Sequence, residues 1–440
     1  MVTINYSSIP SGPGYWLRWA NIWAARRKFL RVDASTRWRQ SFKPDGDTRF
    51  PDRSAPFSAL LGRPPGQGFR FLILADTGEG DRSQYALLPL IRAMRADFAI
   101  INGDVAYPAG EFDDFERGFF EPYRNLGMPI WAVPGNHEYY SSYKGREFFD
   151  VFCTRGYASL WDRYGLKLVC QPGTYWELKE PGGPNLAVIA LDTGQNGDLD
   201  GHGLSNPPDT EQLMWLDRRL GLADREEVKV IVLFHIPGLV RQTHDSSTHL
   251  EKLHNVLLSH RSVRLIVCGH EHNYQRYAAD AFKHYLQVHQ GIDALPEHIP
   301  EYIVCGGGGA YLQSTDFKKS EFLVKDVFPE LDAWWQHVKI GTRIVDAARL
   351  SKTLLGAIAG YIEDATRSDS DVAEYLSFLL VFVRNDPATG TTTEVIPVFL
   401  NQVEDLFDLP EGSEVRIEFP GTPTDEKKVD ICLKKNGVVF

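Results

Sequence analysis

Five short polar blocks, each directly after a run of apolar residues, constrain the fold of this chain more than any other feature. Short apolar runs that alternate with helical patterns predict the buried strands of an α/β sheet. Ligands of such sheets bind beyond the carboxyl ends of the strands, so we expect the five blocks to converge at one edge. The blocks are Asp76-Thr77-Gly78, Gly103-Asp104-Val105-Ala106-Tyr107, Gly135-Asn136-His137-Glu138, His235 and Gly269-His270-Glu271-His272.

The blocks together contain enough oxygen and nitrogen donors to hold two metal ions. Asp76 and Asp104 are carboxylates, and either has the chemistry to bridge two ions. Tyr107 is the unusual donor, because a phenol with an ordinary pKa near ~10 ionises at neutral pH only beside a strong Lewis acid, typically a ferric ion. The remaining donors are an amide and three imidazoles: Asn136, His235, His270 and His272. Each block alone is weak evidence, but their conjunction after predicted strands points to one metal site.

The five blocks resemble those of the calcineurin-like metallophosphoesterase superfamily, and specifically its purple acid phosphatase branch. That branch carries DxG, GDxxY, GNH followed by Asp or Glu, VxxH and GHxH, and all five patterns are present between Phe69 and Ala310. Gly78 and Tyr107 select the branch, because other branches usually have His and lack Tyr at these positions. The resemblance implies an α/β fold (an α+β sandwich) in which two packed mixed β-sheets are flanked by helices, with a dinuclear metal site at the carboxyl edge of the strands.

The resemblance also assigns the ligands. Asp76, Asp104, Tyr107 and His272 would bind Fe(III). Asp104 would bridge to a divalent ion, Fe, Zn or Mn, whose other ligands would be Asn136, His235 and His270.

Two further histidines are expected to act on the substrate. His137 resembles the family histidine that contacts the phosphoryl group or protonates the leaving oxygen, and His244 stands where relatives place a second such histidine. Asp245 departs from relatives with two successive histidines at that place. The implied reaction is hydrolysis of a phosphomonoester, a phosphorylated small molecule, by hydroxide activated at the Fe(III)-M(II) centre. The alternatives are a phosphodiesterase or nucleotide pyrophosphatase with the same centre, and a non-catalytic scaffold of the same fold.

The composition and the N-terminal sequence argue against some functions and predict where in the cell the protein is found. Of the 440 residues, 58 are Asp or Glu and 47 are Lys or Arg, a net charge of -11, which argues against a nucleic-acid binder. The five cysteines show no CxxC pairing, no secretory signal is recognised at the N-terminus, and no apolar run is long enough to span a bilayer. We therefore expect a cytoplasmic protein.

The pattern along the chain divides it into four parts. Residues 1–68 contain an amphipathic helix at 15–31 and a linker rich in Pro and Gly, residues 69–312 the phosphoesterase core, residues 313–375 a helical insert, and residues 376–440 strands that return to the core sheet plus a tail. Two interpretations of the helix at 15–31 stay open: it packs its tryptophans on the core, or it makes peripheral contact with anionic lipid. The role of the insert and the oligomeric state are not predicted.

Overall fold

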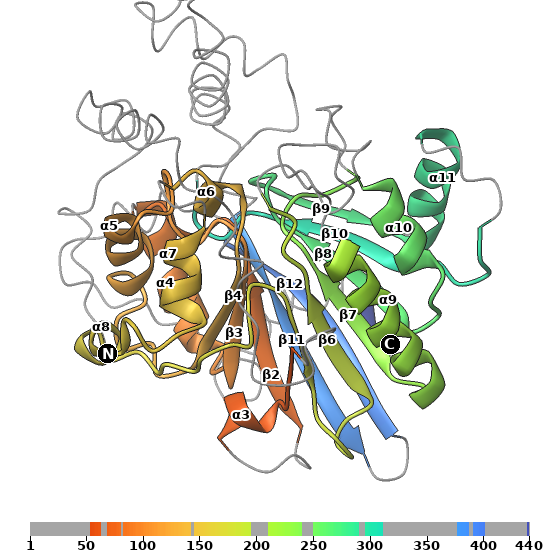
Figure 1. Ribbon diagram of the computed structural model, residues 1–440, viewed down its shortest axis with the longest axis horizontal. Helices are drawn as coiled ribbons and strands as arrows, with labels where there is room; N and C mark the ends of the chain where they lie inside the picture. Colours follow the sequence, from red (N-terminus) through yellow and green to blue (C-terminus); the bar gives the residue numbers. More distant parts are fainter. Residues whose placement is uncertain are drawn as a thin grey trace, which may run out of the picture.

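Two β-sheets pack face to face at the centre of the molecule, and helices cover the outer face of each sheet (Figure 1). This arrangement confirms the predicted fold class of two mixed sheets flanked by helices. The computed structural model describes residues 53–62, 68–80, 82–141, 145–194, 210–239, 250–289, 295–310, 376–386, 390–400 and 438–439. The predicted helix at 15–31 and the insert at 313–375 lie outside these ranges, as does His244.

The six-stranded sheet has the order β13-β12-β11-β2-β3-β4. Its strands are β2 (Phe69–Leu74), β3 (Phe98–Asn102), β4 (Ile130–Val133), β11 (Leu376–Asp386), β12 (Gly390–Leu400) and β13 (Val438–Val439). β2, β3 and β4 run parallel, whereas β11 and β12 form an antiparallel hairpin whose first strand pairs with β2. Strands from both ends of the chain therefore build one sheet.

The seven-stranded sheet has the order β1-β5-β6-β7-β8-β10-β9. Its strands are β1 (Ser54–Ala55), β5 (Trp176–Lys179), β6 (Leu186–Ala190), β7 (Lys229–Leu233), β8 (Val263–Cys268), β9 (Tyr274–Tyr277) and β10 (Glu301–Cys305). β6, β7, β8 and β10 run parallel. Their carboxyl ends therefore lie along one edge of the sheet.

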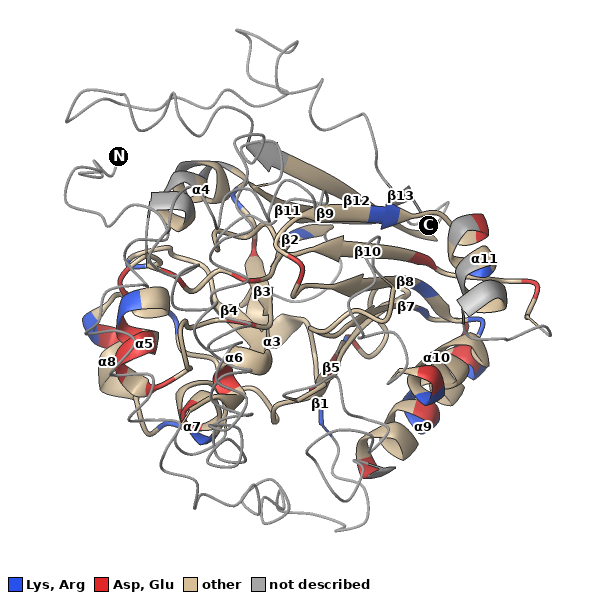
Figure 2. Cartoon of the chain, turned by 90° about the horizontal axis from the view of Figure 1, so that it is seen from above, with Lys and Arg blue, Asp and Glu red and all other residues tan. Residues whose placement is uncertain are grey.

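Helices bury the two outer sheet faces in separate clusters of apolar side chains. The helices are α3 (Ser58–Leu61), α4 (Arg82–Ala93), α5 (Phe112–Phe115), the π-helix η3 (Glu116–Phe120), α6 (Asn136–Tyr139), α7 (Arg146–Phe152), α8 (Ala158–Arg163), α9 (Thr210–Glu226), α10 (Glu251–Leu258) and α11 (Ala279–His289). Leu87 of α4 and Phe148 of α7 pack on the six-stranded sheet, and Leu216 of α9 and Leu253 of α10 pack on the seven-stranded sheet. Figure 2 shows many of the charged residues on α5, α8, α9 and α10, while most of the strand residues are uncharged.

Strand β2 has a continuous apolar sequence after Arg70, without alternating polar residues. Successive side chains of a strand point to opposite faces. Phe71 and Ile73 therefore enter the cluster between the two sheets, while Leu72 and Leu74 enter the cluster under the helices. From Phe71 to Leu74 both faces of the strand are buried, which is the condition under which a continuous apolar run is stable as a strand.

Within the described residues, no helix is both long enough and apolar enough to cross a membrane.

Candidate metal centre

The predicted blocks lie directly after the carboxyl ends of parallel strands in both sheets. Asp76 follows β2, Asp104 follows β3 and Asn136 follows β4 in the six-stranded sheet. In the seven-stranded sheet His235 follows β7 and His270 follows β8. Because the sheets pack face to face, these strand ends meet, and the structure brings all seven predicted ligand residues together.

Tight backbone turns aim three of these side chains. Asp76, Asp104 and His270 have φ angles of 57°, 49° and 71°, in the left-handed region that costs a residue with a side chain about 1–2 kcal/mol. Such strain persists only where surrounding contacts impose it, and it is common at functional sites.

Gly78 is required by close packing of the first two blocks. A Cβ atom at this position would lie 2.0 Å from the carbonyl oxygen of Val105. The backbone of Gly78 also accepts the Tyr107 N–H at 3.0 Å. The glycine thus lets the loop after β2 contact the loop that carries Tyr107.

A first group of donors converges on the hydroxyl of Tyr107. This oxygen lies 3.2 Å from Oδ1 of Asp76, 3.0 Å from Oδ2 of Asp104 and 3.0 Å from Nε2 of His272. All four side chains are buried. A phenol has one proton, which it cannot donate fully to both carboxylates at once, so this cluster of oxygens and nitrogen has the composition of a cation site.

A second group of donors shares Asp104 with the first. Oδ1 of Asn136 lies 3.1 Å from Nε2 of His235 and 2.9 Å from Nδ1 of His270. Nε2 of His235 is also 3.2 Å from Oδ2 of Asp104. One ligand atom each from Asp104, His235 and His270 lies within 4.8 Å of the others, and the same holds for Asp76, Asp104 and His272. The donor set therefore fits two cations with Asp104 between them.

Neighbouring groups orient the donors of the second group. Nδ1 of His235 lies 3.0 Å from the carbonyl oxygen of Asn102, a contact in which Nδ1–H donates, so that Nε2 is the ring atom turned toward the site. Nδ2 of Asn136 donates to the hydroxyl of Tyr140 at 3.0 Å, which turns Oδ1 toward the two imidazoles. Tyr140 therefore selects which end of the Asn136 amide faces the site.

Burial and charge act in opposite directions on the ionisable groups. Burial disfavours the charged form of Asp104, but His235 and His137 outweigh it and hold the pKa of Asp104 below its ordinary value. Burial likewise opposes protonation of His235, but Asp104 and Asp76 raise its pKa to about 9. Burial and then the carboxylates of Asp104 and Asp76 raise the pKa of Tyr107 well above its ordinary value. A phenolate at Tyr107 therefore needs additional positive charge beside it.

His137 faces the same site from α6 without joining either donor group. Its ring lies 4.2 Å from that of Tyr107 and 4.9 Å from that of Tyr140, measured between ring centroids. Nδ1 is 2.7 Å from the carbonyl oxygen of Pro108, and Nε2 is 3.9 Å from Oδ2 of Asp104. Burial lowers the pKa of His137, although Asp104 partly opposes this shift.

The structure adds four supporting residues to which sequence analysis assigned no role. Glu138 is fully buried and accepts hydrogen bonds from the N–H groups of Val105 and Ala106 at 2.9 Å each, which holds the Tyr107 loop against α6. The other three are Asn102, Tyr140 and Asp192. The signal for Glu138 is its place as the acid after Gly-Asn-His. Asn102 and Asp192 act through tertiary contacts that no local pattern marks, whereas Tyr140 contacts Asn136, four positions earlier in the chain.

The calcineurin-like phosphoesterase family model matches residues 69–274, the part of the chain that carries all five blocks. Residues 69–274 therefore match a calcineurin-like phosphoesterase domain. The curated proteins similar to it include tartrate-resistant acid phosphatase type 5 from Mus musculus, 25% identical over 236 residues that cover 50% of this chain and 62% of the relative. The protein of the same name from Homo sapiens is 25% identical over 234 residues, covering 50% and 63%. The matches thus span less than two thirds of these relatives and confirm the predicted resemblance to the phosphoesterase family.

Two solved structures resemble the chain more distantly. A purple acid phosphatase, PPD1, from yellow lupin (Lupinus luteus) seeds has 14% sequence identity and a TM-score of 0.44, covering 76% of this chain and 52% of that chain. A dimetal phosphatase from Danio rerio has 17% identity and a TM-score of 0.36, covering 56% of this chain and 89% of that chain.

Proposed function

We propose that the calcineurin-like phosphoesterase domain hydrolyses phosphate esters, with phosphomonoesters of small molecules as substrates. The observation that carries the proposal is the pair of donor groups that share Asp104. Two adjacent cation sites with a common carboxylate suit in-line phosphoryl transfer. The similarity to acid phosphatases supports the same reaction class.

The ligand assignment follows the chemistry of the two groups. The first group would hold Fe(III), since a phenol and two carboxylates match a hard trivalent ion. Its members are Tyr107, Asp76, Asp104 and His272. The second group would hold the divalent ion, Fe, Zn or Mn. Its members are Asp104, Asn136, His235 and His270. Bound ions would acidify water and offset the negative charge that develops on the phosphoryl oxygens.

His137 is the proposed general acid for the leaving alkoxide. Its Nδ1–H is committed to the carbonyl of Pro108, so Nε2 is the atom that faces the site. Burial lowers the pKa of His137, which makes its imidazolium a stronger acid. The proton therefore passes from Nε2 to the departing oxygen. His244, outside the described residues, is proposed as a second histidine that contacts the substrate.

Turnover of 4-nitrophenyl phosphate and of its bis ester by the full chain loaded with iron and manganese tests the proposal. We expect two metal ions per chain and faster hydrolysis of the monoester. Faster hydrolysis of the bis ester would assign a phosphodiesterase instead. A metal-free protein after loading, without turnover of either ester, would overturn the proposal in favour of a non-catalytic scaffold.

The iron assignment has its own spectroscopic test. A tyrosinate bound to ferric iron absorbs visible light, so the loaded protein should be violet to pink and Tyr107→Phe should be colourless at equal iron content. A colourless wild-type protein with full iron content would contradict the role of Tyr107.

A further inference from the structure

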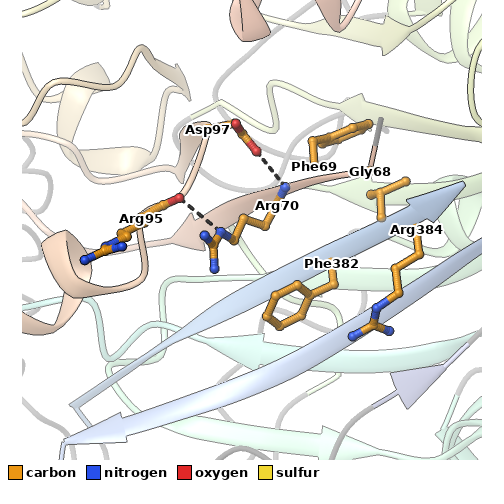
Figure 3. A pocket seen from close by; sticks show the side chains of 8 residues that line it. Gly68, Phe69, Arg70, Arg95, Asp97, Phe382 and Arg384 are labelled. Carbon is orange, nitrogen blue, oxygen red and sulfur yellow. Dashed lines mark hydrogen bonds between the residues drawn. The ribbon is translucent and has the colours of Figure 1, made fainter. Parts of the chain in front are cut away.

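A second candidate site lies at the opposite end of strand β2 from the metal ligands. An open cavity of about 340 Å³ is formed there by residues of β2 and β11 and by the turn before β3. Figure 3 shows the side chains that matter for its chemistry: Phe69, Arg70, Arg95, Asp97, Phe382 and Arg384. Arg70 and Asp76 are six residues apart along extended chain, so roughly 20 Å separates the cavity from the metal centre.

The lining of this cavity is cationic although the whole chain is anionic. Three arginines and one aspartate line it, whereas the chain carries a net charge of -11. Arg384 is partly neutralised, since its Nη1 lies 2.7 Å from Oε2 of Glu394. The carboxylate of Asp97 accepts the backbone N–H of Arg70 at 2.9 Å. Asp97 therefore fixes the backbone at the cavity.

Arg70 has the donor geometry of an anion-binding residue. Its Nε donates to the carbonyl oxygen of Arg95 at 3.0 Å, which anchors the guanidinium and leaves both terminal nitrogens for a ligand (Figure 3). Within the described ranges, neither Arg70 nor Arg95 takes part in an ion pair. A guanidinium anchored at Nε presents a fork that matches two oxygens of a phosphate.

The aromatic side chains give the cavity an apolar wall. Phe382 is half-buried and faces Arg70 across the β2–β11 pairing, since the two residues are register partners. The Arg384 guanidinium lies 5.3 Å from the centroid of the Phe382 ring. A ligand with both an anionic group and a flat apolar part fits such a lining. The volume is at the lower end of the range for small-molecule sites.

We propose that this cavity binds a small phosphate-bearing anion at a site separate from the metal centre. Arg70 and Arg95 would bind the phosphate oxygens, and Phe382 would contact the organic part of a phosphomonoester. Inorganic phosphate has the same anionic chemistry and lacks that organic part. The two sources are therefore distinguished by the contribution of Phe382.

Calorimetric titration of the metal-loaded full chain with phenylphosphonate, which has no ester bond to hydrolyse, tests the site. We expect two binding events in the wild type and one in Arg70→Gln, or a second event weakened by about tenfold or more, since a charge-assisted contact is lost. Turnover of 4-nitrophenyl phosphate should be unchanged in this variant. One event in the wild type, or two equal events in the double variant Arg70→Gln with Arg95→Gln, would overturn the proposal.

Two controls make the result specific. Arg146→Gln removes another exposed arginine, which pairs with Asp150 at 2.9 Å in α7, and should keep both events. Loss of the second event in this control would show a general charge effect and overturn the proposal. A titration with inorganic phosphate then identifies the source. If phenylphosphonate binds this cavity more tightly than inorganic phosphate does, and Phe382→Leu removes the difference, the ligand is an organic phosphate. Equal affinity for the two compounds indicates inorganic phosphate.

Discussion

The same tripeptide, Asp-Thr-Gly, follows a buried strand in each of the two sheets, with different consequences. Asp76 after β2 lies among the metal donors, and its Oδ1 is 3.4 Å from Nε2 of His272, which follows β8 of the seven-stranded sheet. Asp192 after β6 instead accepts a hydrogen bond from the hydroxyl of Tyr139 at 2.7 Å. Both carboxylates are buried. The partner that the opposite sheet presents, rather than the tripeptide, decides whether the aspartate belongs to a donor cluster or to a contact between the sheets.

The sheets also differ in what they contribute to the centre. The six-stranded sheet supplies the oxygen donors Asp76, Asp104, Tyr107 and Asn136, and the seven-stranded sheet supplies the nitrogen donors His235, His270 and His272. Neither sheet alone has the donor set for two ions. The packing of the two sheets against each other therefore brings the donor set together.

Exchanging the two aspartates for asparagine tests the comparison directly. Asp76→Asn should lower turnover by roughly 10⁴-fold, because the first donor group loses a charge and its ion. Asp192→Asn should keep turnover within a few-fold and cost about 1 kcal/mol of unfolding free energy, since its hydrogen bonds from Tyr139 and from the Gly194 N–H are weakened. Metal content by mass spectrometry and turnover on the same preparations measure both effects. Equal loss of metal in the two variants would remove the distinction between them.

The next prediction tests whether His137 acts in the reaction and not in metal binding. His137→Ala should lower turnover by about 10²- to 10⁴-fold, the usual scale for a general acid, while both ions stay bound. Substrates with a better leaving group should lose less, because they need less protonation. A loss that is equal for 4-nitrophenyl and alkyl phosphates would assign His137 to substrate binding instead.

The features that are local in sequence are the ones that sequence analysis predicted. The apolar runs before the five blocks form strands β2, β3, β4, β7 and β8, as predicted. The convergence of the blocks followed from the parallel arrangement of those strands. Strands β5 and β6 were not named, since no recognised ligand block follows them.

Contacts across the two sheets could not be predicted from local patterns. Asn102 donates through Nδ2 to the carbonyl oxygens of Phe234 at 3.1 Å and Val267 at 3.0 Å, 132 and 165 positions away in the chain. A buried asparagine at the end of a strand carries no sign of these partners before the sheets are packed together. The neighbouring residues Tyr139 and Tyr140 differ in the same way: Tyr139 donates to the distant Asp192, whereas Tyr140 accepts from Asn136, four positions earlier.

That pair of neighbouring tyrosines gives a matched test of smaller effect. Tyr140→Phe removes the acceptor that orients the Asn136 amide, so affinity for the divalent ion should fall by about 10- to 100-fold. Tyr139→Phe removes only the contact between the sheets and should leave that affinity unchanged, at a stability cost of about 1 kcal/mol. Competition for the divalent ion with a chelator measures the affinity. If both variants bound metal equally well, Asn136 would not depend on Tyr140.

The last predicted effect changes stability and not the metal centre: it is a pH dependence in the helices that cover the six-stranded sheet. Burial raises the pKa of Glu147 in α7 from 4.5 to about 7, despite a hydrogen bond from Ser141 at 2.8 Å. The folded state therefore holds this proton more tightly than the unfolded chain does. The stabilisation is fully present below pH ~4.5 and is lost as the pH rises through about 7, the pKa in the folded state.

Glu147→Gln should remove this dependence, because glutamine does not ionise and its amide oxygen still accepts the Ser141 hydroxyl. Between pH 5 and pH 8 the wild type should lose about 2 kcal/mol more unfolding free energy than the variant, as measured by urea denaturation. The control is Glu211→Gln, at an exposed position of α9 on the seven-stranded sheet, which should leave the wild-type slope unchanged. Parallel pH profiles for wild type and Glu147→Gln would show that Glu147 is ionised in the folded protein at neutral pH, and that the two helical layers do not differ in this respect.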